Sequence, residues 1–301
     1  MASDGRSYVT GYFAMDLDGV KCGLIQKFEG GDVEGEVTTL PIAHDYYVAK
    51  QIGNVKYNDF TVQMGLSMGQ PVKDWIDNSL AMNYMRKSGE LKAADFKRDT
   101  RHIREFKDAR ITGITFPSGD AAAKDPAFMT LKFAPWISRN KKGDGSKVEN
   151  PADMVQKVYH PTDFRFVVDG LDKACAKVQK VEAFDIKQSV VSDSIGQERD
   201  YFKEPGKIDF PNCKITLSEE YSHDFFAWHE DFVINGNNEH EKHKSATMVY
   251  LNRNRQKELL TLTLSGVGIF KISAAPRANN EDKIAAVTVE MYCENIVSKF
   301  S

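Results

Sequence analysis

Two aspartates near the start of the chain, Asp16 and Asp18, have the types and the spacing that phosphoryl transfer uses. They end an apolar run that begins at Phe13, and Gly19 follows them. In such a pair one carboxylate can attack phosphorus while the other acts as general acid, with Mg²⁺ bound beside both. The same residues also suit a strand that enters a tight Asp-Gly turn.

The segment 13–20 resembles the first motif of haloacid-dehalogenase-type phosphatases, which implies a later acidic pair, here Asp120 with Asp125. Strands and helices do not alternate regularly between these motifs. The second half of the chain has only Asp169-Gly170 at the matching place. We therefore interpret both early aspartates as part of a turn and expect no catalytic residue. A Mg²⁺-dependent phosphatase that uses them stays as a distant alternative.

Ser67 lies between Gly65 and Gly69, a spacing that exposes a nucleophilic serine in some hydrolases, and His102 follows as a candidate base. Such a serine sits on a sharp turn between a strand and a helix of a parallel sheet. A parallel sheet is not indicated here, and the matching segment 218–222 lacks the pattern. The preferred interpretation is a plain turn flanked by glycines.

Imidazoles bind zinc readily, and four histidines gather in the second half, at His223, His229, His240 and His243. The residues from 235 to 244 are otherwise polar, which predicts a solvated loop. The 4 cysteines have no spacing typical of metal ligands and are too few for a disulfide framework. We expect reduced thiols, no bound metal and no cofactor.

The composition is that of a folded protein with balanced charge. Of the 301 residues 41% are hydrophobic, enough for two cores of ordinary size. The formal charge of -3 excludes a global basic surface that would bind DNA, and the basic run 87–104 is interleaved with acids, which predicts a solvated face. The chain has no apolar stretch of membrane-spanning length and no secretory signal pattern. We expect folding in the bacterial cytoplasm without membrane contact.

The sequence repeats itself at an interval of 153 residues. Residues 26–33 and 179–186 share four identities in eight positions, and the same interval joins Trp75 to Trp228. A repeat of this length corresponds to a whole domain and not to one unit of a solenoid. The chain therefore reads as two related domains in tandem.

The segment after residue 139 is rich in charge and turn-forming residues and nearly devoid of apolar ones. This composition is typical of a linker. We predict a first domain at 1–139, a linker at 140–160 and a second domain at 161–301.

Each half is predicted to contain several strands, one helix and then further strands. The clearest strands are 57–64 and 210–217, where apolar and polar residues alternate. A helix follows each of them and directs its tryptophan, Trp75 or Trp228, toward the core. Further strands are expected at 106–116, 127–134, 258–273 and 284–293. This segregation of strands from helices predicts an antiparallel α+β fold that is mainly β.

The segments 53–62 and 205–217, each followed by a helix with its tryptophan, resemble the tail-tube protein family of contractile-tailed phages and phage-derived contractile injection systems. The second segment matches better, through Pro-Gly-Lys and Phe-Pro-Asn. The resemblance implies two tandem tail-tube-like domains, each with two packed antiparallel sheets in a barrel-like arrangement and one flanking helix. It also implies six domains per ring and rings that stack into a tube.

By the same resemblance, the segments 41–56 and 192–207 would be arms that reach a neighbouring ring, and two strands would line the channel. The arm residues singled out are Tyr46, Tyr47, Lys50, Tyr201, Phe202 and Lys203. The residues expected in the lumen or ring sheet are Thr61, Gln63, Lys214 and Thr216.

Closing a ring removes every exposed strand edge at once, which favours self-assembly on physical grounds. Two domains per chain allow trimeric rings of six domains or hexameric double rings. The resemblance adds sheath and baseplate proteins as partners, and DNA or an effector that passes through the lumen without specific binding. The expected location is a virion tail or an injection particle. The alternative within this class is a tube initiator or a baseplate adaptor.

Overall fold

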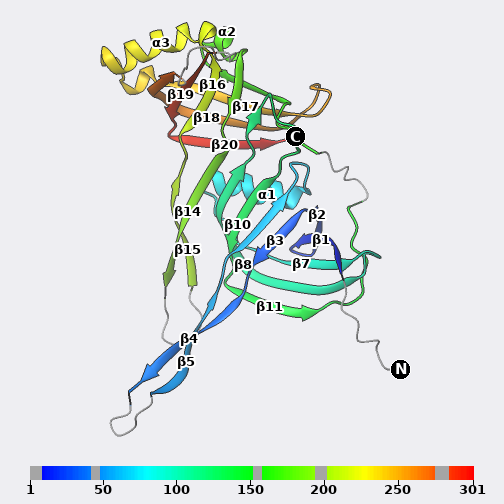
Figure 1. Cartoon of the computed structure of the whole chain (residues 1–301). Coiled ribbons are helices and arrows are strands. Elements are labelled where there is room, and N and C mark those ends of the chain that lie inside the picture. Colours follow the sequence, from blue (N-terminus) through cyan, green and yellow to red (C-terminus); the bar gives the residue numbers. More distant parts are fainter. Residues whose placement is uncertain (1–8, 42–47, 152–157, 194–201, 275–284) are drawn as a thin grey trace.

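The computed structural model describes residues 9–41, 48–151, 158–193, 202–274 and 285–301, and its strands pair antiparallel throughout these ranges (Figure 1). The expected α+β class that is mainly β is confirmed, with packed antiparallel sheets and few helices. We describe the first half as β1 to β11 and the second half as β12 to β20.

In the first half, β1 to β6 precede helix α1 and β7 to β11 follow it. Its elements are β1 (Thr10–Leu17), β2 (Val20–Ile25), β3 (Lys27–Gly30), β4 (Val33–Leu40), β5 (Ala49–Tyr57), β6 (Phe60–Met64), α1 (Gln70–Leu80), β7 (Lys87–Asp95), β8 (Thr100–Phe116), β9 (Gly119–Asp120), β10 (Met129–Ala134) and β11 (Ile137–Lys142).

The second half has a similar order with additional short helices. Its elements are β12 (Phe164–Val168), α2 (Asp172–Cys175), β13 (Val178–Val181), β14 (Phe184–Asp193), β15 (Phe202–Asp209), β16 (Cys213–Ser218), η1 (Glu219–Tyr221), α3 (His223–His229), the π-helical η2 (Glu230–Ile234), η3 (His240–Lys242), β17 (Lys244–Leu251), β18 (Glu258–Ala274), β19 (Ala286–Tyr292) and β20 (Asn295–Phe300).

The strand order of one half recurs in the other. The first sheet contains the path β1-β7-β8-β10-β6-β3 with β11 on β8, and the second contains β12-β17-β18-β19-β16-β13 with β20 on β18. Each half also has a hairpin. In the first half β4 pairs with β5 directly after β3, and in the second half β14 pairs with β15 directly after β13. The halves thus share one topology.

The irregularities of the ladders recur as well. Strands β8 and β18 both have 17 residues, and the pairing skips Thr112 in one and Phe270 in the other. Ile114 therefore corresponds to Ile272. The interval between these two residues exceeds 153, because the helical segment and the turn before β18 are longer in the second half. The interval of 153 holds for β3 to β6 against β13 to β16.

Several strands were not expected from the sequence, among them β7 and β17 and the last strand of each half, β11 and β20. Strand β7 and the start of β8 occupy the basic run 87–104, and β17 occupies the matching place in the second half. Their charged side chains pair across strands, as Lys92 does with Asp16 at 2.5 Å, so a charged pattern conceals a paired strand. Each half ends with two strands and not one.

The Asp-Gly turn is present as predicted. Strands β1 and β2 meet at Asp18 and Gly19, whose φ angles are 47° and 81°. Positive φ at both positions is the geometry of a type I′ hairpin turn, which matches the twist of the strands. In the second half the equivalent Asp169-Gly170 leads into α2 and not into a strand.

The main core is a continuous apolar cluster that spans both halves, and a small second cluster contains Ala14, Ala94 and Val148. Helix α1 begins with Pro71 in its first turn and directs Val72, Trp75 and Ile76 inward at helical spacing. Trp75 is fully buried, and its Nε1 donates to the Met85 carbonyl at 3.1 Å. Trp228 on α3 is 8% exposed. The shared core fixes the halves relative to each other.

Candidate assembly interface

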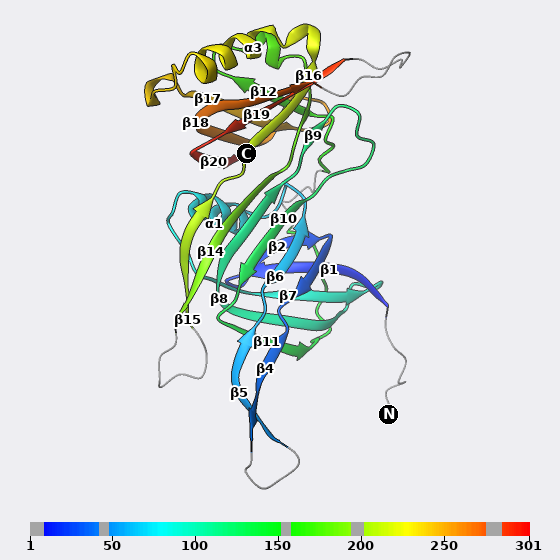
Figure 2. The same ribbon diagram turned by 60° about the vertical axis from the view of Figure 1, so that its left-hand side comes forward.

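A hairpin of the second half completes the sheet of the first. Strand β14 follows β13 in the second half and pairs with the C-terminal end of β8 in the first. The paired residues run from Phe184 opposite Phe116 to Lys187 opposite Gly113. Figures 1 and 2 show β14 and β15 extending from the second half along the first. We call β14–β15 the docked hairpin. It is an example of strand addition to a sheet edge, here within one chain.

Charged groups hold the docked hairpin from one side. Glu204 on β15 accepts hydrogen bonds from Arg110 at 2.6 Å and from Arg86 at 2.5 Å. The Arg110 side chain is 9% exposed, and burial lowers its pKa while the Glu204 carboxylate opposes that change. A buried guanidinium needs this partner, so Glu204 is a positioning residue for the hairpin.

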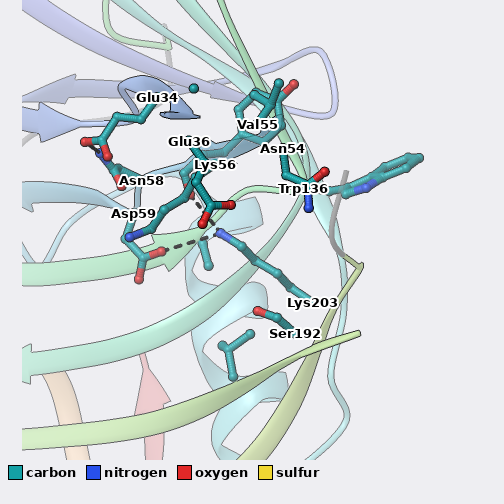
Figure 3. Close-up of a pocket in the computed structure, with 14 residues that line it drawn as sticks. Glu34, Glu36, Asn54, Val55, Lys56, Asn58, Asp59, Trp136, Ser192 and Lys203 are labelled. Carbon is teal, nitrogen blue, oxygen red and sulfur yellow. Dashed lines mark hydrogen bonds and ion pairs between the residues drawn. The ribbon is translucent and has the colours of Figure 1, made fainter. Parts of the chain in front are cut away.

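Lys203 holds the other side. Its Nζ donates to the Tyr57 carbonyl at 3.0 Å and lies 3.8 Å from Asp59, as Figure 3 shows. Burial lowers the pKa of Lys203, and Asp59 counteracts this. These contacts border a pocket of about 740 Å³ between the two hairpins. Another lining residue, Glu34, accepts a hydrogen bond from Asn58, so several polar groups of this seam between the hairpins are paired with one another.

An aromatic contact adds an anchor near the end of β15. The rings of Phe202 and Trp136 stack with centroids 5.1 Å apart. The Trp136 Nε1 is buried without a hydrogen-bond partner among the described residues. Such pairs contribute about 0.5–1.5 kcal/mol beyond the apolar area they bury.

The equivalent hairpin of the first half projects away from the rest of the chain. Within the described residues β4 and β5 pair only with each other (Figure 2). All eight residues of β4 are exposed, and Val33 is 46% exposed where its counterpart Ile186 is 2% exposed. We call β4–β5 the projecting hairpin. Exposed apolar residues along an unpaired strand edge are typical of an interface.

The strand edge equivalent to the docking edge is also open. In the described part of the chain, residues 271–274 of β18 pair with β19 on one side and with no strand on the other. Phe270 is 37% exposed and Ile272 is half-buried, whereas the matching Ile114 is covered by β14. Among the described strands, one edge of this kind is thus filled and one is open.

The structure places the predicted arm residues on these hairpins. Lys50 lies on the exposed β5, while Phe202 and Lys203 on β15 contact the first half of the same chain. Tyr46, Tyr47 and Tyr201 lie outside the described residues. Arg110 and Glu204 were not singled out from the sequence, because nothing in their spacing links the two.

The predicted lumen residues share the face of the sheets opposite the core. Thr61 and Gln63 alternate with buried residues on β6, and Lys214 and Thr216 do so on β16. The ion pair of Lys27 with Glu29 at 2.9 Å is repeated by Lys180 with Glu182 at 2.9 Å. These residues form a polar face with both signs of charge in each half.

The enzymatic candidates are not assembled into a site. Asp16 pairs with Lys92 at 2.5 Å, and Asp18 pairs with Lys87 at 2.6 Å. Asp120 lies on β9, which pairs with β13 of the second half. His102 lies within β8, with strand neighbours on both sides. The two aspartates act as ion-pair partners that join β1 to β7.

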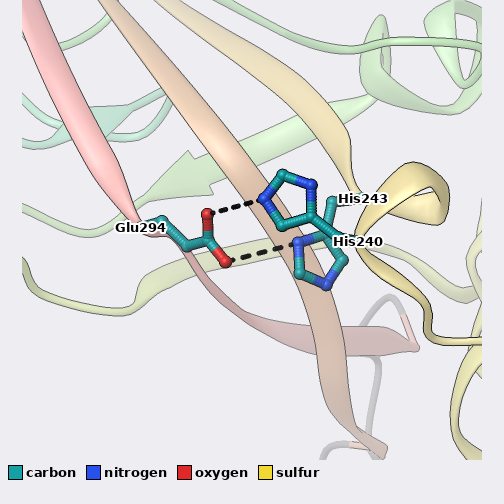
Figure 4. A group of neighbouring side chains, drawn as sticks. All are labelled: His240, His243 and Glu294. Carbon is teal, nitrogen blue, oxygen red and sulfur yellow. Dashed lines mark ion pairs between the residues drawn. The ribbon is translucent and has the colours of Figure 1, made fainter.

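Of the predicted histidines, two lie together with a carboxylate. Ligand atoms of His240, His243 and Glu294 all lie within 4.8 Å of one another, and each histidine nitrogen is 3.5 Å from a Glu294 oxygen (Figure 4). Tyr292 Oη lies 3.0 Å from His243 Nε2. The His240 side chain is 83% exposed. Two imidazoles and a carboxylate are ligand types for zinc, and equally form an ion pair when a histidine is protonated.

The four cysteines are free thiols in this structure. Cys22, Cys175 and Cys213 are buried, and Cys293 is half-buried. Burial raises the pKa of Cys175 and Cys293 to about 11 and that of Cys22 to about 12. These thiols are therefore poor nucleophiles at neutral pH.

No family model and no curated protein matches the sequence. The chain is similar to the tube-terminating cap of the anti-feeding prophage, with 14% identity, a TM-score of 0.37 and coverage of 49% of this chain and 94% of that chain. It is similar to a chain of the PVC sheath-tube complex of an extracellular contractile injection system, with 17% identity, a TM-score of 0.33 and coverage of 46% and 89%.

A third similarity is to a chain of the PVC sheath/tube terminator, with 18% identity, a TM-score of 0.35 and coverage of 45% and 93%. All three structures are parts of contractile injection machines. At this degree of similarity the function has to be argued from the strand edges of the chain itself. None of the described helices is long and apolar enough to cross a membrane.

Proposed function

We propose that the chain is a structural subunit that joins copies of itself into a closed β-barrel, as part of the inner tail tube of a contractile tail or injection machine. In this proposal the two halves are tandem copies of a tail-tube-like domain. One observation carries it: a hairpin fills a strand edge inside the chain, while the equivalent hairpin and the equivalent edge both face outward.

An open strand edge and an exposed hairpin present unpaired backbone N–H and C=O groups, which form a template for pairing with another chain. The two surfaces are different, so a contact between them is heterologous, and repetition gives a ring when the rotation closes. If six domains form a ring, three chains supply them. Six chains in two layers are the alternative arrangement.

The polar face suits the wall of a channel. Lysines and acids alternate on it and neutralise each other in pairs such as Lys271 with Glu290 at 2.8 Å. A surface of mixed charge has no strong field for a polyanion. In this proposal DNA or an effector passes through without specific binding, and Thr61, Gln63, Lys214 and Thr216 face the lumen.

Neighbouring rings, the sheath and the baseplate complete the proposed set of partners. The arm at 41–56 would contact the next ring, whereas residues 202–204 of the second predicted arm, 192–207, lie against the first half of the same chain. The particle would assemble in the bacterial cytoplasm and become part of a virion tail or an injection particle. Neither a cofactor nor a catalytic residue is required for this role.

A tube initiator or baseplate adaptor is the second candidate, and the difference between the two outer surfaces favours it. Helix α1 contacts β20, whereas the helical segment of the second half has an exposed apolar end at Phe226, Val233 and Ile234. Two unlike faces would suit two unlike partners.

Electron microscopy of the purified protein separates these functions. Stacked rings or hollow tubes support the tail tube, and single rings support the initiator. Monomers at every concentration contradict both. Asp16→Asn tests the phosphatase, because it would abolish phosphate release by such an enzyme and should leave rings unaffected.

A further inference from the structure

The repeated topology predicts how one copy meets the next. We propose that β4 of one chain pairs antiparallel with residues 271–274 of β18 in a second copy, in the register that β14 uses on β8. This inference rests on the proposed self-assembly and adds its residue pairs. It would make the contact between chains a repeat of the contact within each chain.

The intrachain contact is the template. Asp185 lies opposite Thr115, and the Thr115 hydroxyl donates to the Asp185 carboxylate at 2.8 Å. Ile186 lies opposite Ile114, and both are 2% exposed. The template thus combines an apolar pair toward the core with a hydroxyl-carboxylate bond on the polar face.

Ladder irregularities fix the counterparts on the accepting edge. In the first half the pairing of β8 with β10 skips Thr112 of β8, and in the second half the pairing of β18 with β19 skips Phe270 of β18. Counting from these bulges, Ser273 takes the place of Thr115 and Ile272 that of Ile114.

The bulges of the two hairpin ladders likewise identify the counterparts on the projecting hairpin. The bulge between Gly35 and Val37 in the β4–β5 pairing matches the bulge between Gln188 and Val190 in the β14–β15 pairing. Asp32 and Val33 therefore take the places of Asp185 and Ile186. The proposed contacts between chains are Asp32 with Ser273, Val33 with Ile272, and Glu34 with Lys271.

The residue types agree with this register although it was derived from backbone pairing alone. Asp32 and Ser273 again offer a carboxylate and a hydroxyl. Val33 and Ile272 again offer two β-branched apolar side chains, which suit cross-strand pairs. Glu34 and Lys271 add opposite charges where the template has Lys187 opposite Gly113.

The occupant of the open edge is a second copy because the two surfaces cannot meet within one chain. Figures 1 and 2 both show the projecting hairpin at one end of the molecule and β18 at the other. The hairpin already has the length and the bulge of the segment that fills the equivalent edge. Contacts within and between chains would then alternate around the ring.

Paired cysteines test the register. Val33→Cys together with Ile272→Cys should give covalent oligomers on mild oxidation, seen by denaturing electrophoresis without reductant. Val33→Cys together with Ser273→Cys is the matched control for a one-residue slip, since it places the thiols on opposite faces. Each single-cysteine variant controls for disulfides between the introduced thiol and one of the four native cysteines.

The outcomes separate this inference from the proposed function. Cross-linking of the first pair with little in the slipped pair supports the register. Assembly into rings without cross-linking of the first pair overturns the register and leaves self-assembly intact. A protein that is monomeric by mass overturns both.

A second variant covers the case in which the cysteines perturb the strands. Val33→Asp should abolish rings while the chain stays folded, because Val33 is exposed in the single chain. Val20→Asp on β2, where Val20 is 51% exposed, should leave rings unchanged. Equal assembly of both variants would overturn the proposed pairing.

Discussion

At the scale of residues, the docked hairpin depends on two largely buried cations whose acidic partners are half-exposed. Arg110 is buried and Glu204 is its partner, while Lys203 reaches a backbone carbonyl and Asp59. Ion pairs on the surface contribute little, but a buried charge that loses its partner is strongly destabilising. Single side chains at this seam should therefore differ measurably from similar pairs elsewhere.

Glu204→Gln should lower the free energy of unfolding by about 1–3 kcal/mol, since it leaves the Arg110 guanidinium without a counter-charge. Urea titration followed by circular dichroism measures this. The matched control is Glu258→Gln, whose partner Arg165 is 57% exposed. A control variant as destabilised as Glu204→Gln would contradict a special role for the seam.

The cysteines give a prediction about pH. Burial raises the pKa of Cys22 to about 12 in the folded state, so the thiolate is scarce at neutral pH. In the unfolded chain the thiol returns to its ordinary pKa, and more thiolate is present at the same pH. Alkylation at pH 8 should therefore label Cys22 slowly in the native protein and readily in urea. Mass spectrometry of the labelled peptides reads this out, and fast native labelling would refute the buried placement.

At the scale of elements, two glycines bend one long strand so that β3 stays in the sheet while β4 leaves it. Gly30 and Gly31 have φ angles of 85° and 73°, and a Cβ on Gly31 would lie 2.0 Å from the Phe60 ring. The second half has Ala183-Phe184 at this place. The bend thus directs the projecting hairpin by a local device that the docked hairpin does not use.

Gly31→Ala should destabilise the fold more than Gly19→Ala. Both positions have positive φ, which costs an alanine about 1–2 kcal/mol, but nothing lies within 4 Å of a Cβ on Gly19. The clash with Phe60 should add about 1–3 kcal/mol. Thermal unfolding of the two variants compares them, and equal melting temperatures would contradict the tight packing at the bend.

Several elements could be predicted from the sequence because their cause is local. Alternation on β6, the Asp18-Gly19 turn and the proline at the start of α1 each depend on neighbouring residues. Strand β7 could not be predicted, because its lysines have the pattern of a solvated face. Their partners are Asp16 on β1 and Asp18 in the turn after β1. The identity of β7 as a strand depends on a partner distant in sequence.

At the scale of the whole molecule, the docked and projecting hairpins are matched by the 153-residue repeat but have different environments. The sequence-based prediction treated 41–56 and 192–207 alike, as arms toward another ring. It could not place one of them on the same chain, because that choice depends on how the two cores meet. Tyr250, which donates to the Pro117 carbonyl at 2.9 Å, helps to set this arrangement.

The mass of the assembled protein in solution tests the central claim most directly. Sedimentation equilibrium over a wide range of concentration should give three times the mass of one 33.9 kDa chain, or a multiple of that trimer. Such a mass is what six domains in a ring require. A mass of one chain at every concentration, with amides of β4 and of residues 271–274 exchanging freely, would contradict the account.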